Sequence, residues 1–212
     1  NEGIINYYYL TGYRRAYDVA MEIGDFALRL NGQANRIKQW RLYEHQFDRN
    51  SSNNWRILLK HYELTGDERF KEESEKWRGF YLSNSPKSFD FSTFMTVRYL
   101  LPTYALDYQL FGDERVAEEI MKIARWLQEQ LNKKEDAYVS QCFLAPVVSF
   151  DITRGGGPLE GLLKKWWKAL IAAYQSPEPY CTSMGEFREM RWNEFEPLFY
   201  FLRACRDANI HE

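Results

Sequence analysis

The chain has 212 residues, which is enough for one ordinary domain with its own hydrophobic core. Apolar residues make up 45% of it and aromatic residues 17%, a composition that argues against disorder. The net charge of −2 argues against a nucleic-acid partner, and no run approaches the roughly 20 apolar residues of a membrane span.

Three segments of the chain share one pattern when they are aligned on a glycine. In each segment a tyrosine precedes the glycine by four residues, a leucine precedes it by two, and an aromatic residue follows it by fourteen. Matches at fixed offsets indicate a repeated structural unit. The glycines are Gly12, Gly66 and Gly112, the tyrosines Tyr8, Tyr62 and Tyr108, the leucines Leu10, Leu64 and Leu110, and the late aromatics Phe26, Phe80 and Trp126.

The first unit, residues 3–30, predicts a hairpin whose first helix is short. Residues 51–82 predict a full helix hairpin, because apolar side chains from Trp55 onward recur at steps of three, one and three residues. A hydroxyl of Ser51 or Ser52 is predicted to cap the start of this hairpin by accepting a hydrogen bond from a free amide.

The turn of the second unit follows from Thr65-Gly66, since glycine adopts the left-handed conformation that ends a helix at little cost. Asp67 suits the positive end of the helix that follows. Residues 91–132 predict a third hairpin, with a kink at Pro102. A fourth, irregular unit is predicted over residues 157–174 and 186–209.

These units predict an all-α fold of repeated antiparallel helix hairpins in a single domain over residues 1–212. The tight turns fall at one end of the hairpins. The long links fall at the opposite end and are predicted at residues 31–50, 83–90 and 133–156. Loops of that length in a compact domain are often functional, so any site is expected on the long-link side.

The turn pattern resembles that of the α/α-toroid domains of carbohydrate-active proteins, such as six-hairpin glycosidases and polysaccharide lyases. The phrases "NEGIINYYYLTG" and "NNWRILLKHYELTGDERF" look closest to the toroid domain of exo-rhamnogalacturonan-lyase-like proteins. The matching positions are Tyr62, Leu64, Thr65, Gly66, Asp67 and Arg69, and again Tyr108, Leu110, Gly112, Asp113 and Arg115.

The resemblance implies a hairpin ring and an oligo- or polysaccharide partner. A ring of six or seven hairpins needs about 300 residues at roughly 50 per hairpin, and this chain holds about four hairpins. Additional protein domains or subunits are therefore expected to complete the ring. The chain does not begin with Met, which is compatible with a processed form or an excerpt, so both a cytoplasmic and an exported location stay open.

The loop at residues 39–55 holds the densest set of chemically capable side chains. Trp40 offers an aromatic platform for a sugar ring, whose hydroxyls need hydrogen-bond partners. A lyase acting on a uronic acid needs a base and a group that stabilises the enolate, roles that His45 and either Arg49 or Asn54 could fill. The alternative interpretation is a loop followed by helix-cap residues.

A glycosidase would need two carboxyl groups across a cleft, and Asp48 and Asp151 could serve if the fold brings their loops together. Asp151 and Arg154 precede three glycines and a helix start, where free amides bind anions. We interpret this stretch as a flexible loop at the mouth of the ring, with Arg154 contacting substrate, rather than as a phosphate cradle. The three consecutive tyrosines at residues 7–9 are interpreted as packing residues.

Cys142, Cys181 and Cys205 show no metal-ligand spacing, and no histidine lies in a zinc motif, so no metal and no cofactor is expected. The sequence thus leaves two functional hypotheses. The first is a polysaccharide lyase or glycoside hydrolase that acts on acidic or pectic glycans. The second is a non-catalytic helical-repeat scaffold that binds a glycan or a protein partner.

Overall fold

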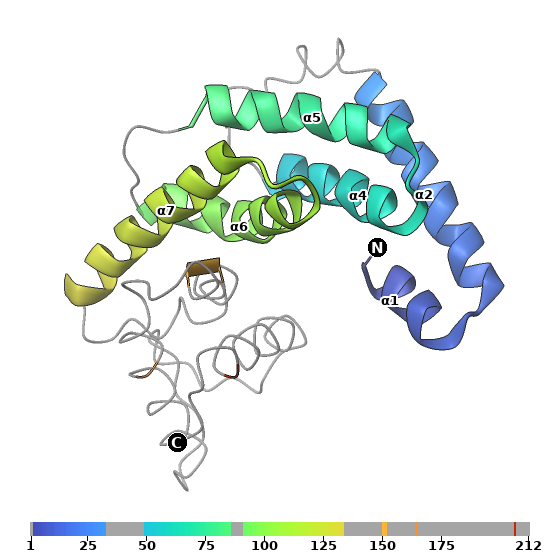
Figure 1. Ribbon diagram of the computed structural model, residues 1–212, viewed down its shortest axis with the longest axis horizontal. Helices are drawn as coiled ribbons and strands as arrows, with labels where there is room; N and C mark the ends of the chain where they lie inside the picture. The colour runs from blue at the N-terminus through green and yellow to red at the C-terminus, as the bar shows by residue number, and fades with distance from the viewer. Residues whose placement is uncertain are drawn as a thin grey trace, which may run out of the picture. The chain divides into compact units, whose positions relative to one another are not determined.

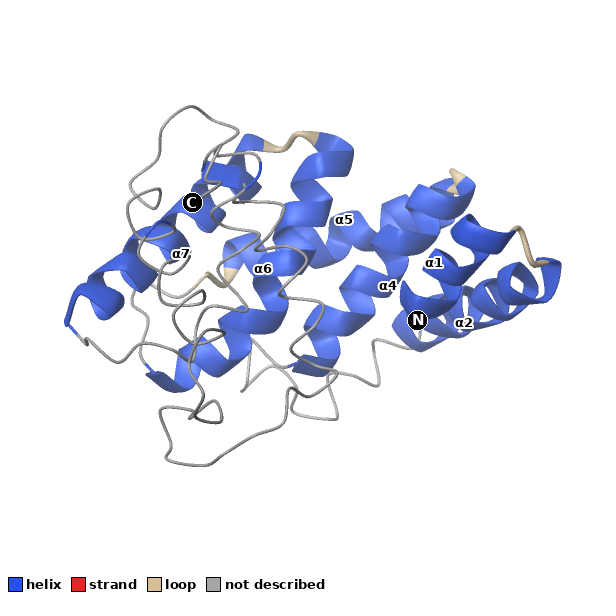
Figure 2. Cartoon of the chain, turned by 90° about the horizontal axis from the view of Figure 1, so that it is seen from below, coloured by secondary structure: helices blue, strands red, loops and turns tan. Residues whose placement is uncertain are grey.

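The computed structural model describes residues 2–32, 49–85 and 91–133, together with residues 150, 151, 164 and 206. These residues form helices and short turns, and no strand occurs among them (Figure 2). The all-α prediction is therefore confirmed for this part of the chain. The helices are α1 (Glu2–Thr11), α2 (Arg14–Gly32), α4 (Arg49–Thr65), α5 (Glu68–Ser83), α6 (Phe91–Phe111) and α7 (Glu114–Lys133) (Figure 1).

The chain divides into two compact units, residues 1–117 and residues 118–212. The first unit holds α1 to α6 and the start of α7. Within it, α4 is the central helix, packing against α2, α5 and α6, while α1 packs mainly against α2 (Figure 1). The single domain over residues 1–212 stays a prediction, as does closure into a toroid.

The three predicted glycine turns have the same backbone geometry. Gly12, Gly66 and Gly112 have φ angles of 66°, 67° and 66°, the left-handed region that only glycine enters freely. Each glycine donates its N–H to the carbonyl oxygen of the tyrosine four residues earlier, at 2.7–2.8 Å. This bond satisfies a helix-end carbonyl that would otherwise lack a partner. The prediction of three helix-glycine-helix turns is confirmed.

Side chains reinforce the second of these turns. The Thr65 hydroxyl donates to the carbonyl of His61 at 2.6 Å and accepts from the Asp67 amide at 3.1 Å. Asp67 then accepts from the Arg69 amide at 3.0 Å, which caps α5, and its carboxylate pairs with the Arg69 guanidinium at 2.6 Å. The predicted role of Asp67 at a helix start is confirmed, and Asp113 caps α7 in the same way.

We expect Asp67→Ala to lower the free energy of unfolding by about 0.5–2 kcal/mol, because the mutation removes the cap of α5. The Arg69 hydrogen bond lowers the pKa of Asp67, so this contribution is present above the unfolded value of 3.8 and is lost as the pH falls below it. Urea unfolding of both proteins at neutral and acid pH measures the effect. Glu72→Ala, an exposed change on the same helix, is the control and should have little effect at either pH.

One local prediction is wrong, and the predicted kink at Pro102 stays a prediction. The predicted capping role of Ser51 and Ser52 is wrong, because α4 begins at Arg49 and both serines lie inside its first turn. Their hydroxyls lie 2.6 and 3.3 Å from the hydroxyl of Tyr81 and so join α4 to α5. Pro102 lies inside α6, and the helix continues through it from Phe91 to Phe111.

Candidate functional site: the junctions between hairpins

The same two repeat positions meet wherever one hairpin packs on the next. Positions are counted here from the turn glycine, so that −5 is five residues before it and +12 is twelve residues after it. Position −5 lies on the first helix of each hairpin, and position +12 lies on the second. Position −5 holds Tyr7, His61 and Asp107, and position +12 holds Gly24, Arg78 and Ala124.

At the first junction, position −5 of the second hairpin meets position +12 of the first. The ring of His61 is buried between α4 and α2, with Nδ1 2.7 Å from the carbonyl oxygen of Ile57 and Nε2 2.6 Å from that of Ala20. A carbonyl oxygen only accepts, so both bonds form together only when each ring nitrogen carries a hydrogen. A Cβ atom at Gly24 would lie 2.4 Å from the His61 ring, so glycine is required there for steric reasons.

At the second junction, the same two positions carry a buried ion pair. Arg78 on α5 donates from Nε to Oδ1 of Asp107 on α6 at 2.8 Å, and Nη1 lies 3.7 Å from Asp113. The side chain of Asp107 is fully buried and that of Arg78 is 10% exposed. The guanidinium also lies over the ring of Phe111, at 4.6 Å from its centroid. Arg78 therefore links α5, α6 and the turn that leads into α7.

Arg78 and Asp107 form one hydrogen bond, although a guanidinium and a carboxylate can form two in parallel. Arg78 Nη2 and Asp107 Oδ2 are buried and have no hydrogen-bond partner among the described residues. Ser74 lies one helical turn before Arg78, and its buried hydroxyl is likewise without such a partner. Buried polar atoms of this kind cost stability when they stay unpaired. The second junction thus joins its hairpins through an ion pair. The first junction joins them through the hydrogen bonds of His61 and the close packing of its ring on Gly24.

Burial raises the pKa of Asp107 to about 6, although the Arg78 hydrogen bond and charge act in the opposite direction; the nearby carboxylates of Asp113 and Glu75 raise it further. The native state therefore holds the proton of the Asp107 carboxyl more tightly than the unfolded chain does. The contribution of this group to the free energy of unfolding is fully present below pH 3.8 and is lost as the pH rises through about 6.

Asp107→Asn removes this titration. We therefore expect the free energy of unfolding of the wild type to fall relative to that of Asp107→Asn as the pH is raised from about 4 to about 7. Urea unfolding of both proteins across that range provides the comparison. A difference between them that does not change with pH would show that Asp107 does not titrate there.

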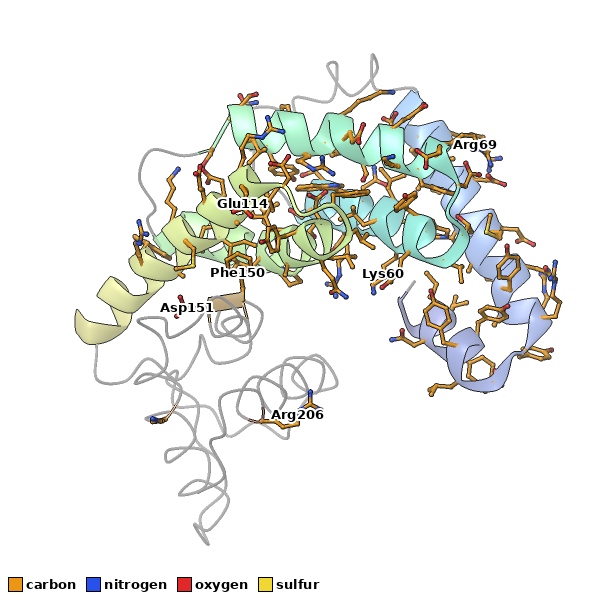
Figure 3. All side chains as sticks on the ribbon, in the orientation of Figure 1. Lys60, Arg69, Glu114, Phe150, Asp151 and Arg206 are labelled. Carbon is orange, nitrogen blue, oxygen red and sulfur yellow. The ribbon has the colours of Figure 1, made fainter. Side chains whose placement is uncertain are left out.

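Further contacts extend each junction along the same face. In the second hairpin, Leu58 and Phe70 pack with Ala27 of α2 in one core cluster. Arg69 lies at the start of α5, beside α2, with its guanidinium 4.0 Å from the carboxylate of Asp25 (Figure 3).

In the third hairpin, the Thr103 hydroxyl donates to the carbonyl of Ser52 at 3.3 Å. The rings of Tyr104 and Trp55 form a T-shaped pair with centroids 5.6 Å apart, and Trp55 in turn stacks on Tyr81 at 5.3 Å. All three aromatic rings are buried, so the second junction has an aromatic core beside its ion pair.

The first hairpin leaves several large apolar and aromatic side chains exposed. Tyr7 and Tyr9 are each 51% exposed and Tyr13 is 55% exposed. The interpretation of residues 7–9 as packing residues is therefore wrong for Tyr7 and Tyr9. It holds for Tyr8, whose ring lies 5.2 Å from that of Tyr17 on α2. Leu10, at the end of α1, is 85% exposed.

The residues predicted to bind or react lie mostly elsewhere. Trp40, His45, Asp48 and Arg154 fall outside the described residues, as do residues 33–48 and 152–156 around them. Arg49 is the first residue of α4, and Asn54 is a half-buried residue of the same helix. Asp151 belongs to the second unit, where it is buried and helical rather than part of an open loop (Figure 3). The convergence of these residues at one mouth stays a prediction.

Neither a metal centre nor a membrane segment is visible in the described ranges. No group of three or more histidine, cysteine or acidic side chains there is arranged to hold a metal ion. None of the helices in those ranges combines the length and the apolar character that crossing a bilayer requires.

The fold and its junctions define an all-α protein of stacked helix hairpins. No protein-family model, curated protein or solved structure matched the chain in the comparisons made with it.

Sequence reasoning missed the junction residues because positions −5 and +12 change their chemistry from one unit to the next. A tyrosine, a histidine and an aspartate share position −5, so no residue type repeats. The available signal was complementarity: a glycine stands at position +12 of the hairpin before His61, and an arginine stands there before Asp107.

Proposed function

We propose that the chain acts as a non-catalytic helical-repeat scaffold that binds a glycan or protein partner. The observation that supports this is how the interior charges are used. Arg78 and Asp107 pair between α5 and α6 with little or no exposure, and the rings of Trp55, Tyr81 and Tyr104 are buried at the same junction. A stack held by buried pairs keeps its outer surfaces in fixed positions, which suits a binding framework.

The turn contacts support the same role. Arg69 and Arg115 each pair with the aspartate of their own turn, at 2.6 and 2.7 Å. These charges stabilise helix starts at the tight-turn end and present no acid and base across a cleft. In this part of the chain the charged groups therefore serve the framework.

A polysaccharide lyase or glycoside hydrolase acting on acidic or pectic glycans is the second candidate. It is supported by the turn motif, since the residues that resemble α/α-toroid domains adopt equivalent turns at Gly66 and Gly112. A shared fold hosts many chemistries, so this support concerns the class of protein more than the reaction. His45, Asp48, Arg49 and Asp151 would carry the chemistry.

One experiment separates the two candidates. The intact protein is incubated with a panel of pectic and uronic-acid-containing oligosaccharides, and both binding and product formation are measured. The scaffold predicts no product for any glycan, including those that bind. The enzyme predicts product whose formation falls sharply in His45→Ala or Asp48→Ala while the melting temperature stays the same. Turnover by the wild type would therefore refute the scaffold proposal.

A further inference from the structure

A hollow of about 320 Å³ lies on the exposed face of the first hairpin, between α1 and α2. It is predominantly apolar, with one arginine at its border. Its lining residues are Gly3, Ile4, Tyr7, Tyr13, Arg15, Ala16 and Val19. Counted from Gly12, they occupy positions −9, −8, −5, +1, +3, +4 and +7.

Five of these positions in the second hairpin meet the hairpin before it. Leu58 and Phe70, at −8 and +4, pack with Ala27 of α2, and Ile57 at −9 joins their cluster. His61 at −5 lies against the Ala20 carbonyl, and Arg69 at +3 lies near Asp25.

The third hairpin uses this face in the same way. Thr103 at −9 reaches the carbonyl of Ser52 on α4. Tyr104 at −8 meets aromatic rings of the second hairpin, including Trp55. Asp107 at −5 and Asp113 at +1 both approach Arg78. Two successive junctions therefore use one face, and the hollow is that face in the first hairpin.

Small residues stand at two of these positions, whereas Tyr7 and Tyr13 are larger than their counterparts at −5 and +1. Gly3 corresponds to Ile57 and Thr103, and Ala16 corresponds to Phe70 and Val116. The missing side-chain volume leaves room that a docked helix would fill.

We propose that this hollow is a docking surface for a helix of a protein partner. That helix is the second helix of another helix hairpin. It would lie on α1 and α2 in the way that α2 lies on α4 and α5. The proposal rests on the scaffold function given above and names its class of partner. It extends the arrangement of the first junction, where α2 packs on α4 and α5; at the second junction the third hairpin meets both α4 and α5 of the hairpin before it.

The first junction indicates the chemistry of this partner helix. On α2, Ala20 and Gly24 stand four residues apart and leave space for the side chain at position −5. Asp25 follows directly and lies near an arginine at position +3. The partner should therefore carry small residues four apart, with an acidic residue next to the second. Arg15 stands at position +3 of the open face, where it is exposed and pairs with exposed Glu22 at 3.2 Å, a surface pair that is readily exchanged.

A peptide of residues 14–32 provides the probe, because its sequence is that of the helix on which the second hairpin docks. It is labelled with a fluorophore, constrained by a lactam bridge on its exposed face, and shown to be helical by circular dichroism before use. The control peptide carries Gly24→Leu. Titration with the intact protein is followed by fluorescence anisotropy. We expect the control peptide to bind about tenfold more weakly or worse, because leucine overpacks the contact with Tyr7.

Two matched variants of the protein locate the binding site. Tyr7→Glu places a charge in the hollow, whereas Leu10→Glu places the same charge on the same helix at an exposed position outside it. Both positions are more than half exposed, so both variants should fold. We expect Tyr7→Glu to weaken peptide binding by about tenfold or more and Leu10→Glu to leave it unchanged.

Three results would overturn the proposal. The first is no binding of the helical peptide, and the second is equal binding of both peptides or of both protein variants. The third is occupation of the hollow by something other than a partner helix. This would be seen as self-association of the chain, or as glycan binding, if either is lost in Tyr7→Glu and retained in Leu10→Glu. The scaffold function is judged separately by glycan turnover, so failure of the peptide assay leaves that result unaffected.

Discussion

Replacing Arg78 with methionine is expected to lower the free energy of unfolding by about 3–5 kcal/mol at neutral pH. The substitution keeps much of the side-chain volume but removes the only cation within 4 Å of the Asp107 carboxylate in the described structure. A fully buried carboxylate then lacks its compensating charge. Urea unfolding monitored by circular dichroism gives the value. The loss should be smaller at about pH 5, because Asp107 can take up a proton there.

The double variant Arg78→Met with Asp107→Leu is the control for this prediction. Removing both partners leaves no buried charge, and exchange of a buried ion pair for packed apolar residues is often neutral or stabilising. We expect the double variant to recover most of the stability lost in the single variant. If it is as unstable as Arg78→Met alone, the loss arises from packing, and the ion pair is not what joins these hairpins.

Gly24→Ala is the second substitution with a large expected effect. Alanine normally favours a helix over glycine by about 1 kcal/mol. Here its Cβ would lie 2.4–2.9 Å from three atoms of the His61 ring, so α2 and α4 would have to separate. We expect a net loss of about 1–3 kcal/mol, again measured by urea unfolding.

The sign of this effect should reverse when the ring is absent. In a His61→Ala background, Gly24→Ala no longer meets the imidazole, and the gain in helix propensity of about 0.5–1 kcal/mol should appear. Gly79→Ala is the matched comparison, because Gly79 is also a helical glycine but no atom lies within 4 Å of the place that a Cβ would occupy there. An equal effect of Gly24→Ala in both backgrounds would show that His61 does not pack against this glycine.

The turns were predictable from sequence because they depend on local backbone geometry. A glycine after a helical run, followed by an aspartate, specifies a left-handed end and a new cap without reference to distant residues. Gly66 with Asp67 and Gly112 with Asp113 both behave as that rule requires. The start of α4 was misplaced because Ser51 and Ser52 suit a cap locally, while the hydroxyl of Tyr81 draws them into a contact between helices.

The junctions were not predictable because they depend on which helices become neighbours. His61 is 37 residues from Gly24 in sequence, and Asp107 is 29 residues from Arg78. No periodicity within one helix identifies such pairs. The exposure of Tyr7 and Tyr9 was misjudged for the same reason, since tyrosine suits both a core and an exposed surface.

The candidate site residues were chosen from loop chemistry, which does not depend on the hairpin framework. His45 and Asp48 lie outside the described residues, so their catalytic roles stay predictions. Asp151 was predicted in an open loop, but burial in a helical segment limits its access to substrate. Its helical state was not foreseeable from the neighbouring glycines, which favour a loop.

The most direct test of the stacked-hairpin account is a nuclear Overhauser measurement between His61 and Gly24. If position −5 of one hairpin meets position +12 of the hairpin before it, the Hδ2 proton of His61 should show a strong cross-peak to the α protons of Gly24. Selective labelling of histidine and glycine makes this peak observable in the intact chain. Cross-peaks from His61 confined to its own helix, with none to Gly24, would contradict the account.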